Sequence, residues 1–253
     1  MLVFYYDHTF EGLLTAIFDA YSRKTFPDYL YEEGAPVPLF VDETYTVVTE
    51  STKANRVWAG LQKKMTKNAC NMLYYAWLAE QVETDNLLIR FIRKAFDSPV
   101  SIETNFADPD VLGVKQIAQK VSHERTYLME FVRFQKAADG IYFAPVSPKY
   151  NALPLAIAHF KDRFADQKWL IYDVRRRYGY YYDCKTVDEV TFEDDAHLLQ
   201  GKLDESLLAA DEKQFQSMWK DYFKAMTIRE RINPKLHRRN LPPRFWKFLT
   251  EKQ

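Results

Sequence analysis

The sequence predicts an α+β fold: a mostly antiparallel sheet with a central β-β-α-β-β unit, surrounded by a large helical portion. Apolar residues at helical spacing dominate the first half of the chain, strand-like runs fill the middle, and one amphipathic helix divides those runs. We expect one domain over residues 1–253. Its helical part lies at about 10–125, its sheet unit at about 127–183 and a basic helical part at about 203–253.

The chain opens with a candidate strand, Leu2–Tyr6, followed by a helix for which Thr9 is a suitable N-cap. Helical spacing places these apolar residues on one face: Phe10, Leu13, Leu14, Ile17, Phe18 and Tyr21. The short apolar run has no basic leader before it, so it predicts a strand rather than a signal peptide.

A loop containing Pro and Gly follows, and the β-branched residues of 44–49 then predict a second strand. Helical patterns extend from Thr52 to Lys94. A further helix is predicted from Asp108 to about Ser122, because its apolar residues recur every three or four positions.

The centre of the chain predicts four strands and one helix. Leu128–Phe134 and Gly140–Pro145 form the first pair of strands, and Trp169–Val174 and Tyr178–Asp183 form the second. Between the pairs, Leu153–Phe164 carries its apolar residues on one helical face. This order predicts a helix packed on a mostly antiparallel sheet.

A last long helix is predicted from Asp211 to Arg231, and the dipeptide Asn233-Pro234 ends it. This helix carries Phe215, Met218, Trp219, Tyr222 and Phe223. Pro242-Pro243 then precedes a final short turn.

Charge is segregated although the chain is neutral, with 35 basic and 35 acidic side chains. Residues 183–212 carry ten acids and two lysines, a net charge of −8. Residues 229–253 carry eight cations and two acids, a net charge of +6. The acidic stretch fits a solvated loop, or a shield for the basic tail when no anion is bound.

No apolar run approaches the roughly 20 residues that cross a bilayer, so we expect a soluble, cytoplasmic protein that does not interact with membranes. Cys70 and Cys184 are far apart in sequence and fit free thiols in a reducing compartment.

Several kinds of catalytic site are excluded because the motifs they require are absent from the sequence. Neither G-x-G-x-x-G nor G-x-x-x-x-G-K-[ST] occurs, and G-x-S-x-G is absent. Two cysteines cannot hold an iron–sulfur cluster. His123-Glu124 begins like a zincin helix, but Tyr127 stands where a second His is needed. The sequence predicts no bound cofactor and no metal.

Three polar residues in or beside apolar runs are candidate catalytic residues: Asp173, His159 and Arg133. Asp173 alternates with Trp169 and Ile171 and is expected to share their face of the sheet. A buried Arg133–Asp173 pair across adjacent strands would be costly unless both charges are satisfied, and such pairs often mark sites. The alternative is an ordinary cross-strand salt bridge at the rim of the sheet.

The basic tail is the candidate nucleic-acid interface, because clustered cations suit phosphates and interleaved rings suit bases. Its candidate residues are Arg229, Arg231, Lys235, Arg238, Arg239, Arg244, Trp246 and Lys247. Alternatively, a terminal helix packs its aromatic residues on the core and exposes a solvated basic face.

Several long motifs resemble a bacterial family of uncharacterised DNA metabolism proteins. They begin with Tyr6-Asp-His-Thr-Phe-Glu-Gly-Leu-Leu-Thr-Ala-Ile-Phe18 and include Phe131-Val-Arg-Phe134, Trp169-Leu-Ile-Tyr-Asp173 and Pro242-Pro-Arg-Phe-Trp-Lys247. The resemblance covers nearly the whole chain. One departure is His8, where the opening motif of the family would have Gly.

The resemblance implies a role in DNA repair or modification. Members of that family are encoded beside a radical-SAM protein, and some are joined to a uracil-DNA glycosylase-like domain. We therefore expect a DNA-binding accessory protein that acts with a radical-SAM partner. The alternative is a stand-alone enzyme acting on DNA or a nucleotide, with acid–base chemistry around Asp173, His159 and Arg133.

Overall fold

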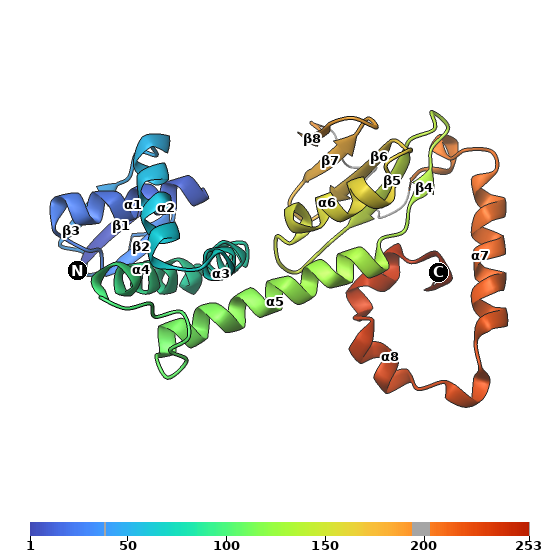
Figure 1. Ribbon diagram of the computed structural model, residues 1–253. Coiled ribbons are helices and arrows are strands. Elements are labelled where there is room, and N and C mark those ends of the chain that lie inside the picture. The colour runs from blue at the N-terminus through green and yellow to red at the C-terminus, as the bar shows by residue number, and fades with distance from the viewer. Residues whose placement is uncertain (38, 194–202, 253) are drawn as a thin grey trace. The chain divides into compact units, whose positions relative to one another are not determined.

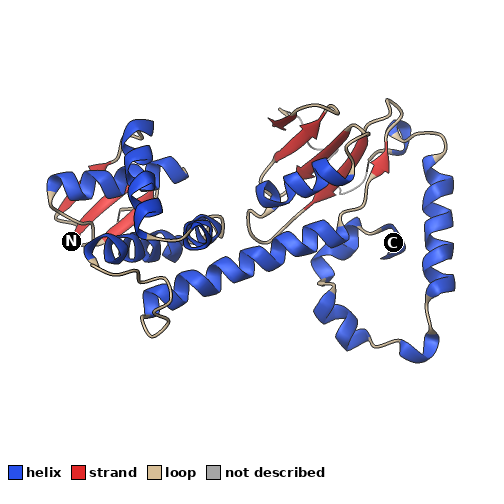
Figure 2. Cartoon of the chain, in the orientation of Figure 1, coloured by secondary structure: helices blue, strands red, loops and turns tan. Residues whose placement is uncertain are grey.

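The structure is a computed structural model that describes residues 1–37, 39–193 and 203–252 (Figure 1). Its helices and strands confirm the predicted α+β class (Figure 2). The chain forms two compact units, Met1–Ser122 and His123–Gln253, and each is described by itself. The single domain expected over residues 1–253 stays a prediction.

The N-terminal unit is built on a three-stranded parallel sheet. β1 (Leu2–Tyr6) lies between β2 (Tyr29–Glu32) and β3 (Glu43–Thr46), and α1 (Phe10–Arg23) connects β1 to β2. The two predicted strands are therefore present, although β3 is shorter than expected. β2 lies in the predicted loop, because its four residues bury only Leu30 and give too short a pattern to recognise.

Three helices account for the helical pattern predicted over residues 52–94. They are α2 (Ser51–Lys64), α3 (Lys67–Trp77) and α4 (Val82–Asp97). Leu61 of α2 and Leu73 of α3 are fully buried and share one apolar core with residues of β1 and α1. Burial of such side chains contributes roughly 1.5–3 kcal/mol each and holds this unit together.

Two residues after β1 ends, His8 lies in the left-handed region with a φ of +55°. A residue with a Cβ costs about 1–2 kcal/mol in that conformation, whereas glycine adopts it freely. This gives a physical reason for the glycine expected at this position. Gly12 is constrained in a different way, because a Cβ there would lie 2.2 Å from Oδ1 of Asp7.

The C-terminal unit contains a five-stranded sheet. In spatial order its strands are β4 (Gln135–Lys136), β5 (Tyr142–Val146), β6 (Trp169–Asp173), β7 (Tyr178–Tyr182) and β8 (Val187–Val190). Each neighbouring pair is antiparallel except β5 and β6, which α6 (Leu153–Arg163) connects in parallel. The predicted order of strand, helix, strand and strand over residues 140–183 is confirmed as β5, α6, β6 and β7, with α6 lying over the sheet (Figure 1).

The predicted strand Leu128–Phe134 is wrong. α5 runs from Pro109 to Phe131, so most of the segment is helical, and only the two residues of β4 pair with β5. The completely buried Val114, Val121 and Leu128 follow one another at seven-residue spacing. This helical spacing extends the helix through Leu128. It is a stronger signal than the weak strand-like alternation within residues 128–134.

The acidic stretch also differs from expectation, because it contains an edge strand where a loop is predicted. β8 pairs with β7, and its Asp188 and Glu189 are exposed. Charged side chains on an edge strand discourage pairing with another chain. Residues 194–202 of the stretch lie outside the described residues.

The C-terminal segment is a series of short helices after one long one. They are η1 (Glu205–Leu207), α7 (Glu212–Met226), η2 (Arg229–Arg231), α8 (Pro234–Asn240), η3 (Pro243–Phe248) and η4 (Thr250–Lys252). The helix predicted to reach Arg231 ends at Met226, where the β-branched pair Thr227-Ile228 follows. α8 begins at Pro234, and Oδ1 of Asn233 caps it by accepting from the Leu236 amide at 3.0 Å.

A buried carboxylate attaches this segment to the rest of the unit. Glu124 of α5 is 2 % exposed and forms an ion pair with Arg244 of η3. It also accepts from the backbone N–H of Lys149 at 2.7 Å, in the turn before α6. A buried charge without a partner is strongly destabilising. The ion pair with Glu124 therefore fixes Arg244, and with it η3, against α5.

Replacing Arg244 by Ala should therefore lower the free energy of unfolding by about 3 kcal/mol, the lower end for a broken buried pair, since Arg244 is itself partly exposed. Arg239→Ala, a change at an exposed position of α8, should stay within about 0.5 kcal/mol. Chemical denaturation followed by circular dichroism measures both. Equal effects of the two changes would contradict the anchoring role of Glu124.

Candidate nucleic-acid interface and adjoining pocket

Asp173 lies at the end of β6, where it organises a turn. Its side chain is completely buried and accepts from the backbone N–H of Arg175 at 2.9 Å and of Arg176 at 3.3 Å. Its other oxygen accepts from Nη1 of Arg176 at 2.9 Å. Burial raises the pKa of the Asp173 carboxyl, and the Arg176 guanidinium offsets part of that rise. This arrangement fixes the β6–β7 connection.

Arg133 lies in the loop after α5, and its guanidinium contacts a carboxylate at the end of the chain. Nη2 donates to Oε1 of Glu251 at 3.0 Å, and Nη1 donates to the carbonyl oxygens of Glu130 and Val132. Among the described residues, the carboxylate partner of Arg133 is thus Glu251, while Asp173 pairs with Arg176. The expected cross-strand Arg133–Asp173 pair does not form.

His159 lies on α6 and is half-buried, with its ring 5.4 Å from that of Phe160. Within the part of the chain that the structure describes, no hydrogen bond or ion pair joins His159, Asp173 and Arg133. Their catalytic roles stay predictions.

The basic tail divides into two parts. Residues 228–240, here called the cationic segment, are exposed apart from the half-buried His237. This segment contains five of the predicted phosphate-binding residues: Arg229, Arg231, Lys235, Arg238 and Arg239. Glu230 is the one acid within it, so the segment carries a net charge of +4.

The remainder of the tail packs on the unit, as the alternative interpretation of the sequence described. Phe245 and Phe248 are buried, and the Phe245 ring lies 5.8 Å from that of Tyr127 on α5. Arg244 is held by Glu124, and Trp246 is half-buried with its indole N–H donating to the Leu241 carbonyl at 3.0 Å. Lys247 is exposed beside them.

α7 presents a row of exposed apolar side chains, here called the apolar stripe. Its members are Phe215, Met218, Trp219, Tyr222, Phe223 and Met226. They recur at helical spacing, and between 36 % and 64 % of each residue is accessible to solvent. Lys220 and Lys224 are exposed on the same helix. Large apolar side chains gathered on one exposed face commonly mark a binding surface.

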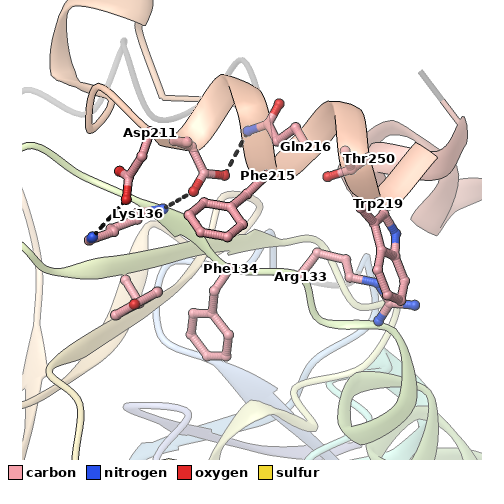
Figure 3. Close-up of a pocket in the computed structure, with 10 residues that line it drawn as sticks. Arg133, Phe134, Lys136, Asp211, Phe215, Gln216, Trp219 and Thr250 are labelled. Carbon is pink, nitrogen blue, oxygen red and sulfur yellow. Dashed lines mark hydrogen bonds and ion pairs between the residues drawn. The ribbon is translucent and has the colours of Figure 1, made fainter. Parts of the chain in front are cut away.

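A pocket of about 480 Å³ lies where α7 faces the first strands of the sheet (Figure 3). Aromatic residues line it from both sides: Phe134, which directly precedes β4, and Tyr142 of β5 on one side, and Phe215 and Trp219 of α7 on the other. The remaining residues of its lining are polar: Arg133, Lys136, Asp211, Glu212, Gln216 and Thr250.

Internal hydrogen bonds hold the polar lining of this pocket in place. Glu212 is buried and accepts from the backbone N–H of Lys136 at 3.1 Å and from the side-chain amide of Gln216 at 2.8 Å. The Lys136 ammonium group lies 3.3 Å from a carboxylate oxygen of Asp211 (Figure 3). Sequence reasoning missed these residues, because contacts between β4 and α7 join positions about 75 residues apart.

Glu251 connects Arg133 to α7. One carboxylate oxygen accepts from Arg133 and the other accepts from the indole N–H of Trp219 at 2.9 Å. Burial would raise the pKa of Glu251, but hydrogen bonds from Trp219 and the backbone, together with the Arg133 charge, hold the pKa below its usual value. Glu251 therefore stays ionised and orients the Trp219 ring in the pocket.

A family described as a domain of unknown function, DUF4130, matches residues 82–251, which is about two thirds of the chain. The protein belongs to the DUF4130 family. This membership is consistent with the resemblance to uncharacterised DNA metabolism proteins, and it assigns no reaction.

Other comparisons add little about function. No curated protein matches the chain. A solved structure of the pGpG-specific phosphodiesterase PggH from Vibrio cholerae aligns with 89 % of this chain and 99 % of its own. The sequence identity is 10 % and the TM-score is 0.37, which is too low to support an argument about fold or function.

The described residues contain no helix that is both long and apolar enough to cross a membrane. They also contain no group of three or more His, Cys, Asp or Glu side chains arranged to hold a metal ion.

The Glu251 contacts generate a pH-dependent prediction. A carboxyl whose pKa is lowered by folding stabilises the protein fully above its ordinary value of 4.5, and this stabilisation is lost as pH falls through the folded pKa. Glu251→Gln should therefore lower the free energy of unfolding by about 1–2 kcal/mol at pH 7, and the difference from the parent should shrink below about pH 4.5. Urea denaturation between pH 7 and 3 measures it.

The exposed pair of Glu205 with Lys213 supplies the matched control, because surface ion pairs contribute little. Glu205→Gln should change stability by less than about 0.5 kcal/mol throughout. If Glu251→Gln showed the same small, pH-independent effect, Glu251 would not fix α7.

Proposed function

We propose that this protein binds DNA as an accessory component of DNA repair or modification. The observation that carries the proposal is the cationic segment, which is exposed and directly follows the apolar stripe of α7 along the chain. Phosphates are bound by cations and unpaired bases by aromatic faces, and these two adjoining surfaces supply one of each.

The cationic segment suits the phosphate backbone. It carries five cations against one acid within 13 residues, on short helices whose side chains are open to solvent. Lys220 and Lys224 extend positive charge along α7. Each cation that neutralises a phosphate releases a counterion, so binding that uses this segment must weaken as salt increases.

The apolar stripe suits unpaired bases. Trp219, Tyr222 and Phe215 are more than one-third exposed, so their rings are accessible to a flat ligand. Stacking on such rings is possible only when a base face is uncovered, as in single-stranded DNA. We therefore expect a preference for single strands over duplex.

The accessory role rests on the site residues and on the family resemblance together. Arg133 and Asp173, two of the three acid–base candidates, are bound by Glu251 and Arg176 in contacts that organise the fold. The geometry therefore favours binding over catalysis in this chain. A radical-SAM partner, which the resemblance implies, would supply the reactive cluster that two cysteines cannot hold.

The proposal predicts that Arg238→Ala combined with Arg239→Ala weakens binding to DNA and flattens its salt dependence. Losing two phosphate contacts should reduce the slope of log K against log salt by about 1.4 for a single strand. Fluorescence anisotropy of a labelled oligonucleotide, measured across a salt series, gives both quantities.

Lys161→Ala combined with Lys168→Ala provides the control, since it removes two exposed cations that lie outside the cationic segment. This control should keep the parent's slope. The assignment fails if the two double variants behave alike while both remain folded. Failure of the parent protein to bind DNA at low salt would overturn the proposed function as a whole.

A further inference from the structure

We propose that the pocket between α7 and the first strands of the sheet binds one unpaired nucleobase. This inference rests on the proposed function and adds the chemical class of the ligand and the place where it binds. The pocket is about 480 Å³, within the roughly 300–1,000 Å³ of sites for small organic ligands. That is far more space than a single water molecule or ion needs.

The shape of the lining points to a flat ligand. Phe134 and Phe215 lie on opposite sides of the pocket, one from the sheet side and one from α7 (Figure 3). Phe134 is held by edge contacts with Phe160 and Phe164, at ring-centre distances of 6.1 and 5.1 Å. One aromatic wall is therefore packed against the core, whereas Phe215 is 58 % exposed and can adjust to a ligand.

Trp219 adds an oriented ring to the α7 side. Its indole N–H donates to Glu251, and the Arg133 guanidinium lies 5.7 Å from the ring centre. Because its edge is fixed, the ring loses little conformational freedom when a ligand binds, and a base would stack on the face that Arg133 does not cover. Stacking of a base on such a face is tolerant of sequence.

The charge of the lining distinguishes a base from a phosphate. Arg133 and Lys136 are the cations of the pocket, and Asp211 and Glu212 are its acids, so the formal charges cancel. Lys136 is paired with Asp211, and Arg133 is paired with Glu251 outside the lining. An anion would gain little here, whereas a neutral heterocycle meets no net charge.

Polar groups of the lining can read the edge of a base. Gln216 donates its amide N–H to Glu212, which fixes the side chain and leaves the amide oxygen as an acceptor. The Thr250 hydroxyl, which can donate or accept, also lines the pocket. The lining therefore combines aromatic faces with hydrogen-bonding groups, as recognition of an unstacked base requires.

The pocket is continuous with the surface proposed to hold phosphates. Gln216, Lys220 and Lys224 follow one another at four-residue spacing and so share one face of α7. A strand whose phosphates contact these lysines would pass beside the pocket, and α7 continues towards the cationic segment. The base of one nucleotide can then enter while its phosphate stays outside.

The test compares a labelled single-stranded oligonucleotide of about 12 nucleotides with an abasic strand of the same length and charge, both by fluorescence anisotropy. Phe215→Ala should weaken binding of the normal strand roughly 5- to 150-fold, since one stacking ring is lost, and should leave the abasic strand unaffected. Gln214→Ala is the control, because Gln214 is exposed on α7 and belongs neither to the pocket lining nor to the apolar stripe. It should bind both strands as the parent does.

A second measurement tests the pocket without the phosphate contacts. Deoxyadenosine and thymidine, added to the ¹⁵N-labelled full-length protein, should shift the side-chain amide signals of Gln216, and Phe215→Ala should reduce the shift. The proposal is overturned if the nucleosides leave those signals unchanged, or if Phe215→Ala affects normal and abasic strands equally.

The two proposals fail in different ways. If neither strand binds but the nucleosides shift Gln216, the cationic segment is not a DNA site and the pocket assignment stands. If both strands bind equally and nucleosides shift nothing, DNA binding stands and the pocket assignment is lost. If neither strand binds and nucleosides shift nothing, both are lost.

Discussion

The buried carboxylate of Glu124 is the constraint on which the C-terminal unit depends. It requires a cation, and Arg244 supplies it from a segment 120 residues later. Once Arg244 is placed, Phe245 and Phe248 pack on the unit, and Thr250 and Glu251 follow within seven residues. Those two residues complete the pocket lining and the contact to Trp219. The ion pair of Glu124 with Arg244 thus helps to position Thr250 and Glu251 beside the pocket.

The same ion pair explains why one part of the basic tail is packed on the unit and the other part is exposed. Its last part is fixed to α5 by Arg244 and by buried aromatic rings, so it has little freedom to meet a ligand. The cationic segment before it lies between two attached ends, α7 and η3, and leaves its side chains in solvent. In the last part, cations lie over aromatic rings, Arg244 over Phe245 and Lys247 over Phe248, whereas the cationic segment contains no Phe, Tyr or Trp. The packing interpretation describes the last part of the tail, and the nucleic-acid interpretation of the cationic segment stays a prediction.

Local patterns predicted most of the fold where an element is long and one-sided. The helices over residues 52–94 and the order of strand, helix, strand and strand over residues 140–183 follow from spacing alone. Short elements were missed, because β2 and β8 have four residues each and β8 contains two exposed acids. The strand predicted over 128–134 was wrong, because whether Leu128 continues a helix depends on the buried face of α5, which the short run does not reveal.

By itself, the sequence determined the fold class, the segregation of charge and the absence of phosphate-binding and nucleophile motifs, because these depend on residue type and local spacing. Only the tertiary structure decided which charges pair. Arg133 binds Glu251, Asp173 binds Arg176 and Arg244 binds Glu124. It also brought Phe134 and Phe215 to one pocket. Contacts between residues so far apart depend on how whole elements pack, and no local pattern in the chain encodes that packing.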